Sequence, residues 1–180
     1  MDSLELERTY LAKELPKEID GADYVEIVDI YIPDGIDFAN LRLRKKGDEY
    51  FMTKKTVVSD DASEQVEQTI ELSLREYEAL SSCSKKRVEK RRYYAQIDGH
   101  DAEVDVFYGD LAGLVLVEFE FANAREKNEF VMPESMLADV TPEEFIAGGM
   151  LAGKKYEEIE GELERFGYKK IDVSDWLGEE

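Results

Sequence analysis

The sequence is poor in the residues that most often mark a reactive centre. It has one cysteine, Cys83, and one histidine among its 180 residues. A single cysteine excludes a disulfide bond within the chain and suits a reducing compartment. The sequence also lacks a paired Cys/His metal motif, a glycine-rich phosphate loop and a nucleophile elbow. These absences argue against a zinc centre, a P-loop nucleotide site and an α/β-hydrolase triad.

Basic residues are scarce as well, with 23 lysines and arginines against 43 aspartates and glutamates. The formal net charge is −20, whereas nonspecific binding to nucleic acid needs a basic surface. We therefore expect no nucleic-acid partner. A site for an anion would have to be built from particular inward-facing basic residues.

Long apolar runs are absent too. The sequence has no stretch of about 18 apolar residues, so no membrane-spanning helix is expected. The N-terminal residues are acidic and polar, unlike a secretory signal. These features predict a cytoplasmic protein that has no membrane partner.

What the sequence does have is repeated alternation of apolar and polar residues, which is typical of β-strands. No linker rich in Pro, Gly or Ser divides the chain, so residues 1–180 are expected to form a single domain. Short connections such as Lys46-Gly47-Asp48 favour antiparallel neighbours. The predicted strands are Leu4–Leu11, Tyr24–Ile32, Asn40–Lys45, Glu49–Val58, Gln65–Leu72, Val88–Ile97, Ala102–Tyr108 and Leu114–Phe121.

Three segments show helical spacing instead, at Ser73–Cys83, Thr141–Ala147 and Lys155–Phe166. In the second segment Thr141 is expected to cap the helix, with Pro142 at its first position and Glu144 completing a capping box. Trp176 is expected to anchor the acidic C-terminal segment on the body of the fold. Together the elements predict an α+β protein, and eight antiparallel strands are about the number that closes a barrel around one small ligand.

Like-charged pairs recur at alternate positions of the predicted strands. One interpretation is the solvated face of a half-buried sheet. Cross-strand pairs favour opposite charges, however, so like charges this close indicate bound ions. A ligand that combines a metal ion with phosphate groups would satisfy acidic and basic pairs together. The pairs are Glu5 and Glu7, Arg42 and Arg44, Lys90 and Arg92, Glu103 and Asp105, and Glu118 and Glu120.

The order of these charged pairs along the chain, and their alternation with apolar residues, resemble the CYTH domain, also called the triphosphate tunnel metalloenzyme superfamily. The resemblance covers nearly the whole chain, and residues 141–151 are similar to the helical closing segment of that family. It implies an eight-stranded antiparallel β-barrel, or tunnel, with helices packed outside. It also implies hydrolysis of a triphosphate with Mg²⁺ or Mn²⁺.

Carried over by position, the resemblance assigns roles to the paired residues. Glu5, Glu7, Lys90 and Arg92 would be catalytic. Phosphate oxygens would be bound by Arg42, Arg44, Lys55, Lys90 and Arg92. The metal would be held by Glu5, Glu7, Glu118 and Glu120. Thr9, Glu67, Glu103 and Asp105 would complete the lining of the tunnel.

The sequence departs from the family at Thr9, where the opening motif Glu-x-Glu-x-Lys has a lysine. Lys13 shares the parity of Thr9 and is a candidate substitute. Inorganic triphosphate is the first substrate expected, because no pocket for an organic group can be identified. The alternatives are a nucleoside or thiamine triphosphatase, a class IV type adenylate cyclase and a non-catalytic module that binds triphosphate or polyphosphate. Members of the family often dimerise, so a homodimer is a further expectation.

Overall fold

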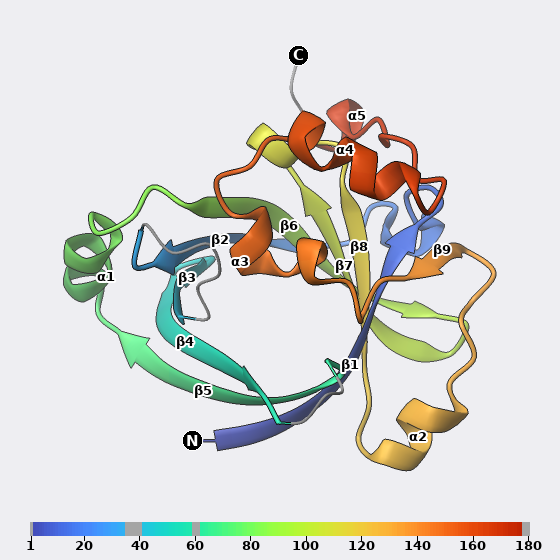
Figure 1. Cartoon of the computed structure of the whole chain (residues 1–180), viewed down its shortest axis with the longest axis horizontal. Coiled ribbons are helices and arrows are strands. Elements are labelled where there is room, and N and C mark those ends of the chain that lie inside the picture. The colour runs from blue at the N-terminus through green and yellow to red at the C-terminus, as the bar shows by residue number, and fades with distance from the viewer. Residues whose placement is uncertain (1, 35–40, 59–61, 178–180) are drawn as a thin grey trace.

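The computed structural model describes residues 2–34, 41–58 and 62–177 and consists of a closed β-barrel with helices outside it (Figure 1). Eight antiparallel strands follow one another around the barrel in the order β5-β4-β3-β2-β6-β7-β8-β1. Pairing of β1 with β5 closes the ring, and β9 pairs with β1 from outside it. The predicted antiparallel barrel with external helices is therefore confirmed.

The strands match the predicted segments closely at both ends. Asn40, the predicted first residue of the third strand, lies outside the described residues. The short strand β9 was not predicted. The strands are β1 (Asp2–Ala12), β2 (Tyr24–Ile32), β3 (Leu41–Lys46), β4 (Glu49–Val57), β5 (Glu64–Leu72), β6 (Arg87–Ile97), β7 (His100–Phe107), β8 (Val115–Glu120) and β9 (Met136–Asp139).

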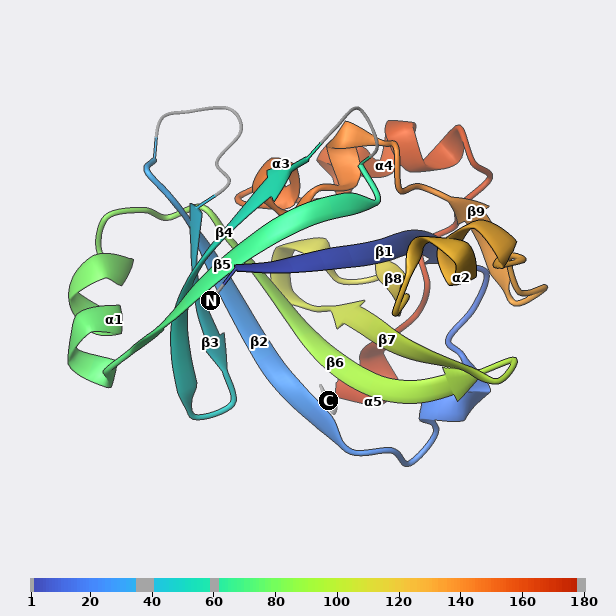
Figure 2. The ribbon, with the colours of Figure 1, turned by 90° about the horizontal axis from the view of Figure 1, so that it is seen from below.

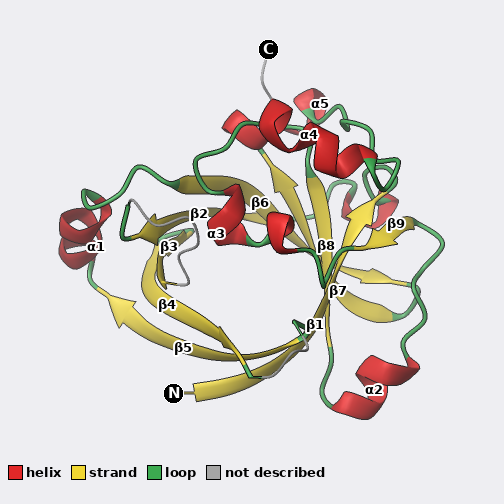
Figure 3. Ribbon diagram, in the orientation of Figure 1, coloured by secondary structure: helices red, strands yellow, loops and turns green. Residues whose placement is uncertain are grey.

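Short helices connect and cover the strands, as Figure 3 shows in red. Ser73 caps α1 with a capping box that was not predicted, in which the Ser73 hydroxyl accepts from the Glu76 N–H. The helix α2 was not predicted. The helices are η1 (Lys17–Ile19), α1 (Leu74–Ser81), η2 (Gly109–Leu111), α2 (Ala124–Glu129), η3 (Glu144–Ile146), α3 (Gly148–Leu151), α4 (Tyr156–Glu164) and α5 (Ser174–Leu177).

The hydrophobic core lies mainly between the barrel wall and these helices. Outward residues of β2 and β3, including Ile30 and Leu43, pack against Tyr77 of α1. On the opposite wall, outward residues of β6, β7 and β8 pack with Trp176 of α5, whose ring lies 6.0 Å from that of Tyr93. The expected anchoring of the C-terminal segment by Trp176 is confirmed. Figure 2 shows α1 and α2 on opposite sides of the barrel.

One end of the barrel is closed by apolar side chains. Inward residues at the ends of their strands, such as Leu11 and Leu116, join a cluster with Leu151 of α3 and Leu163 of α4. Burial of this apolar surface stabilises the closed end and fixes α3 and α4 against it. The remaining interior of the barrel is left to polar and charged side chains.

The prediction of one helix over Thr141–Ala147 is wrong. The Thr141 hydroxyl accepts a hydrogen bond from the Thr9 N–H at 3.0 Å and donates to Asp139 at 2.6 Å. Because this hydroxyl is held by β1 and β9, it does not cap a following helix. The segment instead makes the single 3₁₀ turn η3 and then the four-residue helix α3.

Candidate active site

The paired charges found in the sequence lie on the inner face of the barrel. Strand register places them opposite one another: Thr9 pairs with Glu118, Glu103 with Glu118, and Arg92 with Asp105. We call this set the charged lining. It consists of Glu5, Glu7, Asp29, Arg42, Arg44, Lys55, Glu67, Lys90, Arg92, Glu103, Asp105, Glu118 and Glu120.

Asp105 of β7 is fully buried and holds two cations of β6. Its two oxygens accept hydrogen bonds from Arg92 Nε and Nη2, each at 2.6 Å, and Lys90 Nζ donates to the same carboxylate. Burial alone would raise the pKa of Asp105, but the two cations outweigh it and hold that pKa well below its usual range. Asp105 is therefore ionised at neutral pH.

Arg92 also contacts two glutamates of neighbouring strands. Its Nη1 group donates to Glu103, and its Nη2 group donates to Glu118 at 2.6 Å. Together with Asp105, these contacts give one guanidinium three carboxylate partners. Arg92 therefore compensates part of the negative charge of three carboxylates in this wall.

Asp29 of β2 holds the basic pair of β3 in a similar way. It is 1% exposed, and its oxygens accept from Arg44 Nε and Nη2, each at 2.7 Å. Arg42 Nη1 lies farther away, at 3.8 Å. The pKa of Asp29 lies well below its usual range, because Arg44 and Arg42 outweigh the effect of burial. Sequence analysis missed Asp29. The other residues on the same face of β2 are Val25, Ile27 and Tyr31, so a single aspartate among them could have indicated a buried charge.

Lys55 of β4 bridges the acidic pair of β1. Its Nζ atom lies 2.7 Å from Glu5 Oε2 and 3.2 Å from Glu7 Oε1. Gln65 of β5 donates a further hydrogen bond to Glu7 Oε1 at 3.0 Å. Burial alone would lower the pKa of Lys55, but Glu7, Glu5 and Glu118 together outweigh it and raise that pKa, so this residue stays protonated.

A cavity of about 340 Å³ opens onto part of the charged lining. From the lining it is bordered by Glu7, Arg42, Lys55 and Glu118, together with Thr9. Its other wall is residues 142–149, which we call the capping segment. Lys90 and Arg92 border neither this cavity nor a second one of about 370 Å³ that Glu103, Glu118 and Glu120 line. Both of these cations are buried.

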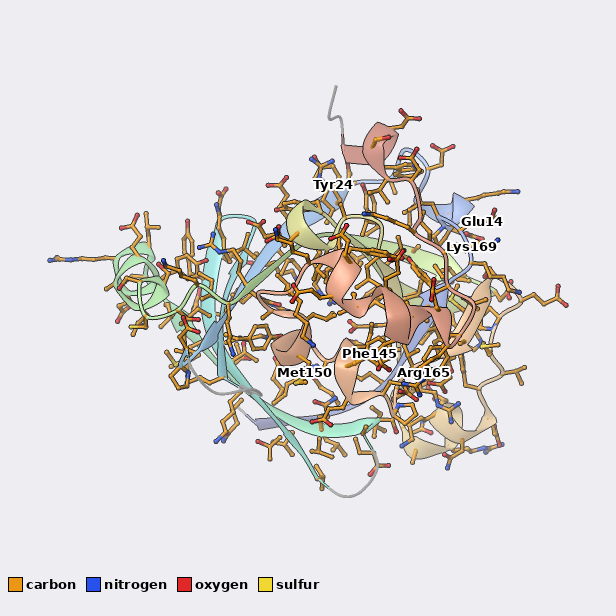
Figure 4. The ribbon with its side chains drawn as sticks, turned by 45° about the horizontal axis from the view of Figure 1, so that its top comes forward. Glu14, Tyr24, Phe145, Met150, Arg165 and Lys169 are labelled. Carbon is orange, nitrogen blue, oxygen red and sulfur yellow. The ribbon has the colours of Figure 1, made fainter. Side chains whose placement is uncertain are left out.

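The capping segment is fastened to the barrel and to α4. Besides the bond between Thr141 and Thr9, the ring of Phe145 stacks on Phe166 with centroids 6.3 Å apart. Figure 4 shows Phe145 close to Arg165 at the end of α4, and Arg165 also pairs with Glu143 at 3.7 Å. Lys13 does not replace the missing lysine, because it is exposed beyond β1 and donates to the Glu134 carbonyl.

Gly148 allows the capping segment to approach Tyr31 of β2, a buried cavity residue that sequence analysis also missed. A Cβ atom on residue 148 would lie 2.0 Å from the Tyr31 hydroxyl. Gly148→Ala should therefore lower the free energy of unfolding by about 1–3 kcal/mol, as overpacking does.

Urea denaturation tests this prediction, with Gly161→Ala as the matched control. A Cβ on Gly161 of α4 would meet nothing within 4 Å, so this change should leave stability equal or raise it by up to about 1 kcal/mol. Equal stabilities of the two variants would show that the contact with Tyr31 does not constrain residue 148.

Comparison with known proteins agrees with this arrangement. Over 140 residues the chain is 36% identical to an inorganic triphosphatase of Nitrosomonas europaea, and the match spans 76% of this chain and 89% of that protein. The chain belongs to the family of that inorganic triphosphatase. No protein-family model matches the sequence.

Two solved structures resemble the fold of this triphosphatase family member. The crystal structure of an inorganic triphosphatase superposes with a TM-score of 0.61 and 32% identity, covering 82% of this chain and 93% of that one. A putative adenylate cyclase from Bacillus halodurans superposes with a TM-score of 0.52 at 17% identity, covering 95% and 94% of the two chains. The second likeness concerns the fold alone.

The donor set of this family member fits a hard divalent cation. Among the described residues, no three Asp, Glu, His or Cys side chains are already grouped as a metal site. Magnesium, however, commonly takes only one or two carboxylates and completes its shell with phosphate oxygens and water. Burial and neighbouring carboxylates raise the pKa of Glu7 and of Glu120, which indicates excess negative charge where β1 and β8 meet. A cation bound there would relieve it.

The same pKa shifts predict how stability changes with pH. Burial raises the pKa of Glu7 despite Lys55 and that of Glu103 despite Arg92, and burial followed by like charges raises that of Glu120, all above the ordinary value of 4.5. The folded protein therefore binds protons more readily than the unfolded chain just above pH 4.5, and its stability falls as pH rises through the raised pKa values. Asp29 and Asp105 have lowered pKa values, so the stability that their charges contribute to the fold is lost only as the pH falls below about 4.

Thermal unfolding in EDTA should accordingly show a higher Tm at pH 5.5 than at pH 7.5. Each kcal/mol gained corresponds to about 2–4 °C for a chain of this size. Glu120→Gln should raise the Tm at pH 7.5 and reduce the difference between the two pH values. A Tm that falls between pH 7.5 and 5.5 would contradict the assignment of crowded carboxylates.

Proposed function

We propose that this chain hydrolyses inorganic triphosphate to pyrophosphate and phosphate inside the barrel, as a CYTH-type tunnel enzyme that uses Mg²⁺ or Mn²⁺. The observation that carries the proposal is the charged lining beside the 340 Å³ cavity, where buried cations and carboxylates alternate around one closed barrel. A triphosphate with a divalent cation is the ligand class that satisfies both signs together. Family membership supports the same substrate.

The cavity favours a substrate without an organic group. Among the described residues that border it, Tyr31 is the only aromatic side chain. Stacking of a base or thiazole commonly uses one or more exposed aromatic faces, and Tyr31 is only 5% exposed. Inorganic triphosphate needs no such surface.

Basic residues at two depths would bind and neutralise the phosphates. Arg42 and Lys55 border the cavity and reach the substrate first. Arg42 Nε is buried without a hydrogen-bond partner among the described residues, so it has an N–H free for a phosphate oxygen. Lys90 and Arg92, held by Asp105, supply positive charge from the wall behind.

Hydrolysis then requires mainly positioning and charge neutralisation. The oxygen of a water molecule attacks the terminal phosphorus, the bridging P–O bond breaks, and its electron pair leaves with pyrophosphate. One hydrogen of the water stays on the phosphate product, and the other leaves as a proton to solvent. Glu5, Glu7, Glu118 and Glu120 would hold the divalent cation, which supplies Lewis-acid neutralisation of phosphate oxygens when bound. Glu118, between Arg92 and the cavity, would link the acidic and basic parts of the site.

A phosphate-release assay tests the proposal. Inorganic triphosphate, ATP and thiamine triphosphate would each be supplied with Mg²⁺, Mn²⁺ or EDTA. We expect phosphate to be released faster from inorganic triphosphate than from ATP or thiamine triphosphate. No release is expected in EDTA. Tight binding of triphosphate without turnover would favour the non-catalytic module, for which Thr9 in place of lysine is the motivating feature. Cyclic AMP from ATP would favour the cyclase instead.

A further inference from the structure

Two buried aspartates each tie one arginine to the barrel wall, which divides the arginines of the lining into a tied pair, Arg44 and Arg92, and the untied Arg42. Asp105 binds the Nε and Nη2 edge of Arg92, and Asp29 binds the same edge of Arg44. In both cases the aspartate and arginine are directly opposed on neighbouring antiparallel strands. The two Asp–Arg pairs therefore repeat one arrangement at separate places in the wall.

Access to the cavity follows this division. Arg44 and Arg92, whose guanidinium edges are tied by an aspartate at 2.6–2.7 Å, do not border the 340 Å³ cavity. Arg42 does border it, and its carboxylate contacts among the described residues are long, at 3.4 Å to Glu67 and 3.8 Å to Asp29. Charge-assisted N–H···O contacts are usually 2.7–2.9 Å, so Arg42 is held much more loosely than Arg44.

We propose that Asp29 is an affinity-determining positioning residue, which ties Arg44 to the wall and leaves Arg42 as the arginine of β3 that grips the triphosphate. This inference rests on the proposed function. It makes the two arginines of the Arg42-x-Arg44 motif unequal, although their spacing and charge suggest equal roles. Asp29 also lowers the net charge of the group formed by Asp29, Arg42 and Arg44 from two positive charges to one.

The charge argument predicts the direction of an Asp29 substitution. Asp29→Asn keeps the side-chain shape, removes one buried negative charge and releases the Nε and Nη2 edge of Arg44. A unit charge about 8 Å from a phosphate at an effective dielectric constant near 40 is worth about 1 kcal/mol per phosphate charge, or about fivefold in affinity. We therefore expect Asp29→Asn to bind inorganic triphosphate about fivefold more tightly than the wild type.

Calorimetric titration with inorganic triphosphate in EDTA measures this without turnover. Arg42→Ala should weaken binding by at least about 20-fold, since it removes a charge-assisted contact, whereas Arg44→Ala in the wild-type background should weaken it less than about threefold. In the Asp29→Asn background Arg44→Ala should abolish the gain in affinity. This dependence of one substitution on the other separates positioning by Asp29 from a purely structural effect.

The outcomes distinguish this inference from the proposed function. Wild-type protein that binds no triphosphate in EDTA would overturn the inference, whereas the proposed function fails separately, by absence of phosphate release with Mg²⁺ or Mn²⁺. Wild-type protein that binds, with Arg44→Ala as damaging as Arg42→Ala, would overturn the inference alone, and that comparison does not depend on Asp29→Asn folding. Weaker binding by folded Asp29→Asn would also overturn it.

Discussion

Replacing Asp105 with asparagine should lower the free energy of unfolding by about 3–5 kcal/mol, the cost of breaking a buried ion pair from one side. Asp105 is 0% exposed and is the shared partner of Lys90 and Arg92. Without its charge two buried cations remain, and Glu103 and Glu118 can compensate only Arg92. Urea denaturation followed by circular dichroism measures the loss.

Asp101→Asn is the matched control for this change. Asp101 lies on the same strand and the same inner parity, but it is exposed and its partner among the described residues is the side chain of Gln96. Its substitution should change stability by no more than about 0.5 kcal/mol, as is usual for surface positions. A loss below about 1 kcal/mol for Asp105→Asn would mean that Asp105 is not the counter-charge of this wall.

The second large effect concerns catalysis. Lys55→Ala should lower kcat/KM for inorganic triphosphate by about 100-fold, which corresponds to about 2.7 kcal/mol of lost transition-state stabilisation. Lys55 borders the cavity and contacts both Glu5 and Glu7, so its loss removes a proposed phosphate contact and leaves two carboxylates less compensated. Initial rates of phosphate release give the value.

The neighbouring residue provides a control of the same chemical type. Lys54 is next in the chain but lies on the outer face of β4 and is exposed. Lys54→Ala should change kcat/KM by less than about twofold. Equal losses in Lys54→Ala and Lys55→Ala would show that the overall charge matters and that the inner face of the barrel does not.

The barrel and the faces of its strands could be predicted from the sequence because both depend on a local pattern. Alternation with a period of two fixes which residues share a face, and turns such as Lys46-Gly47-Asp48 fix the antiparallel order. By this alternation Glu5, Arg42 and Lys90 each fall on the charged face of their strand, and the family resemblance assigns those faces to one tunnel lining. Their roles in binding phosphate or metal stay predictions.

Other features depend on contacts between distant segments, which a local pattern does not encode. Thr141 matches a capping box by sequence, but its hydroxyl accepts from Thr9, 132 residues away. The pairing of Asp29 with Arg44 likewise requires β2 and β3 to be set in register. Such long-range hydrogen bonds decide whether a basic residue is free for a ligand or tied to the wall.

We propose above all that a triphosphate binds inside the barrel between Arg42, Lys55 and Glu118. A crystal structure with a methylene-bridged triphosphate analogue and Mn²⁺ tests it most directly. We predict a three-phosphate chain in the 340 Å³ cavity, with anomalous signal from Mn²⁺ beside Glu7 and Glu118. An analogue bound only on the outer surface, with an empty charged lining, would contradict the account.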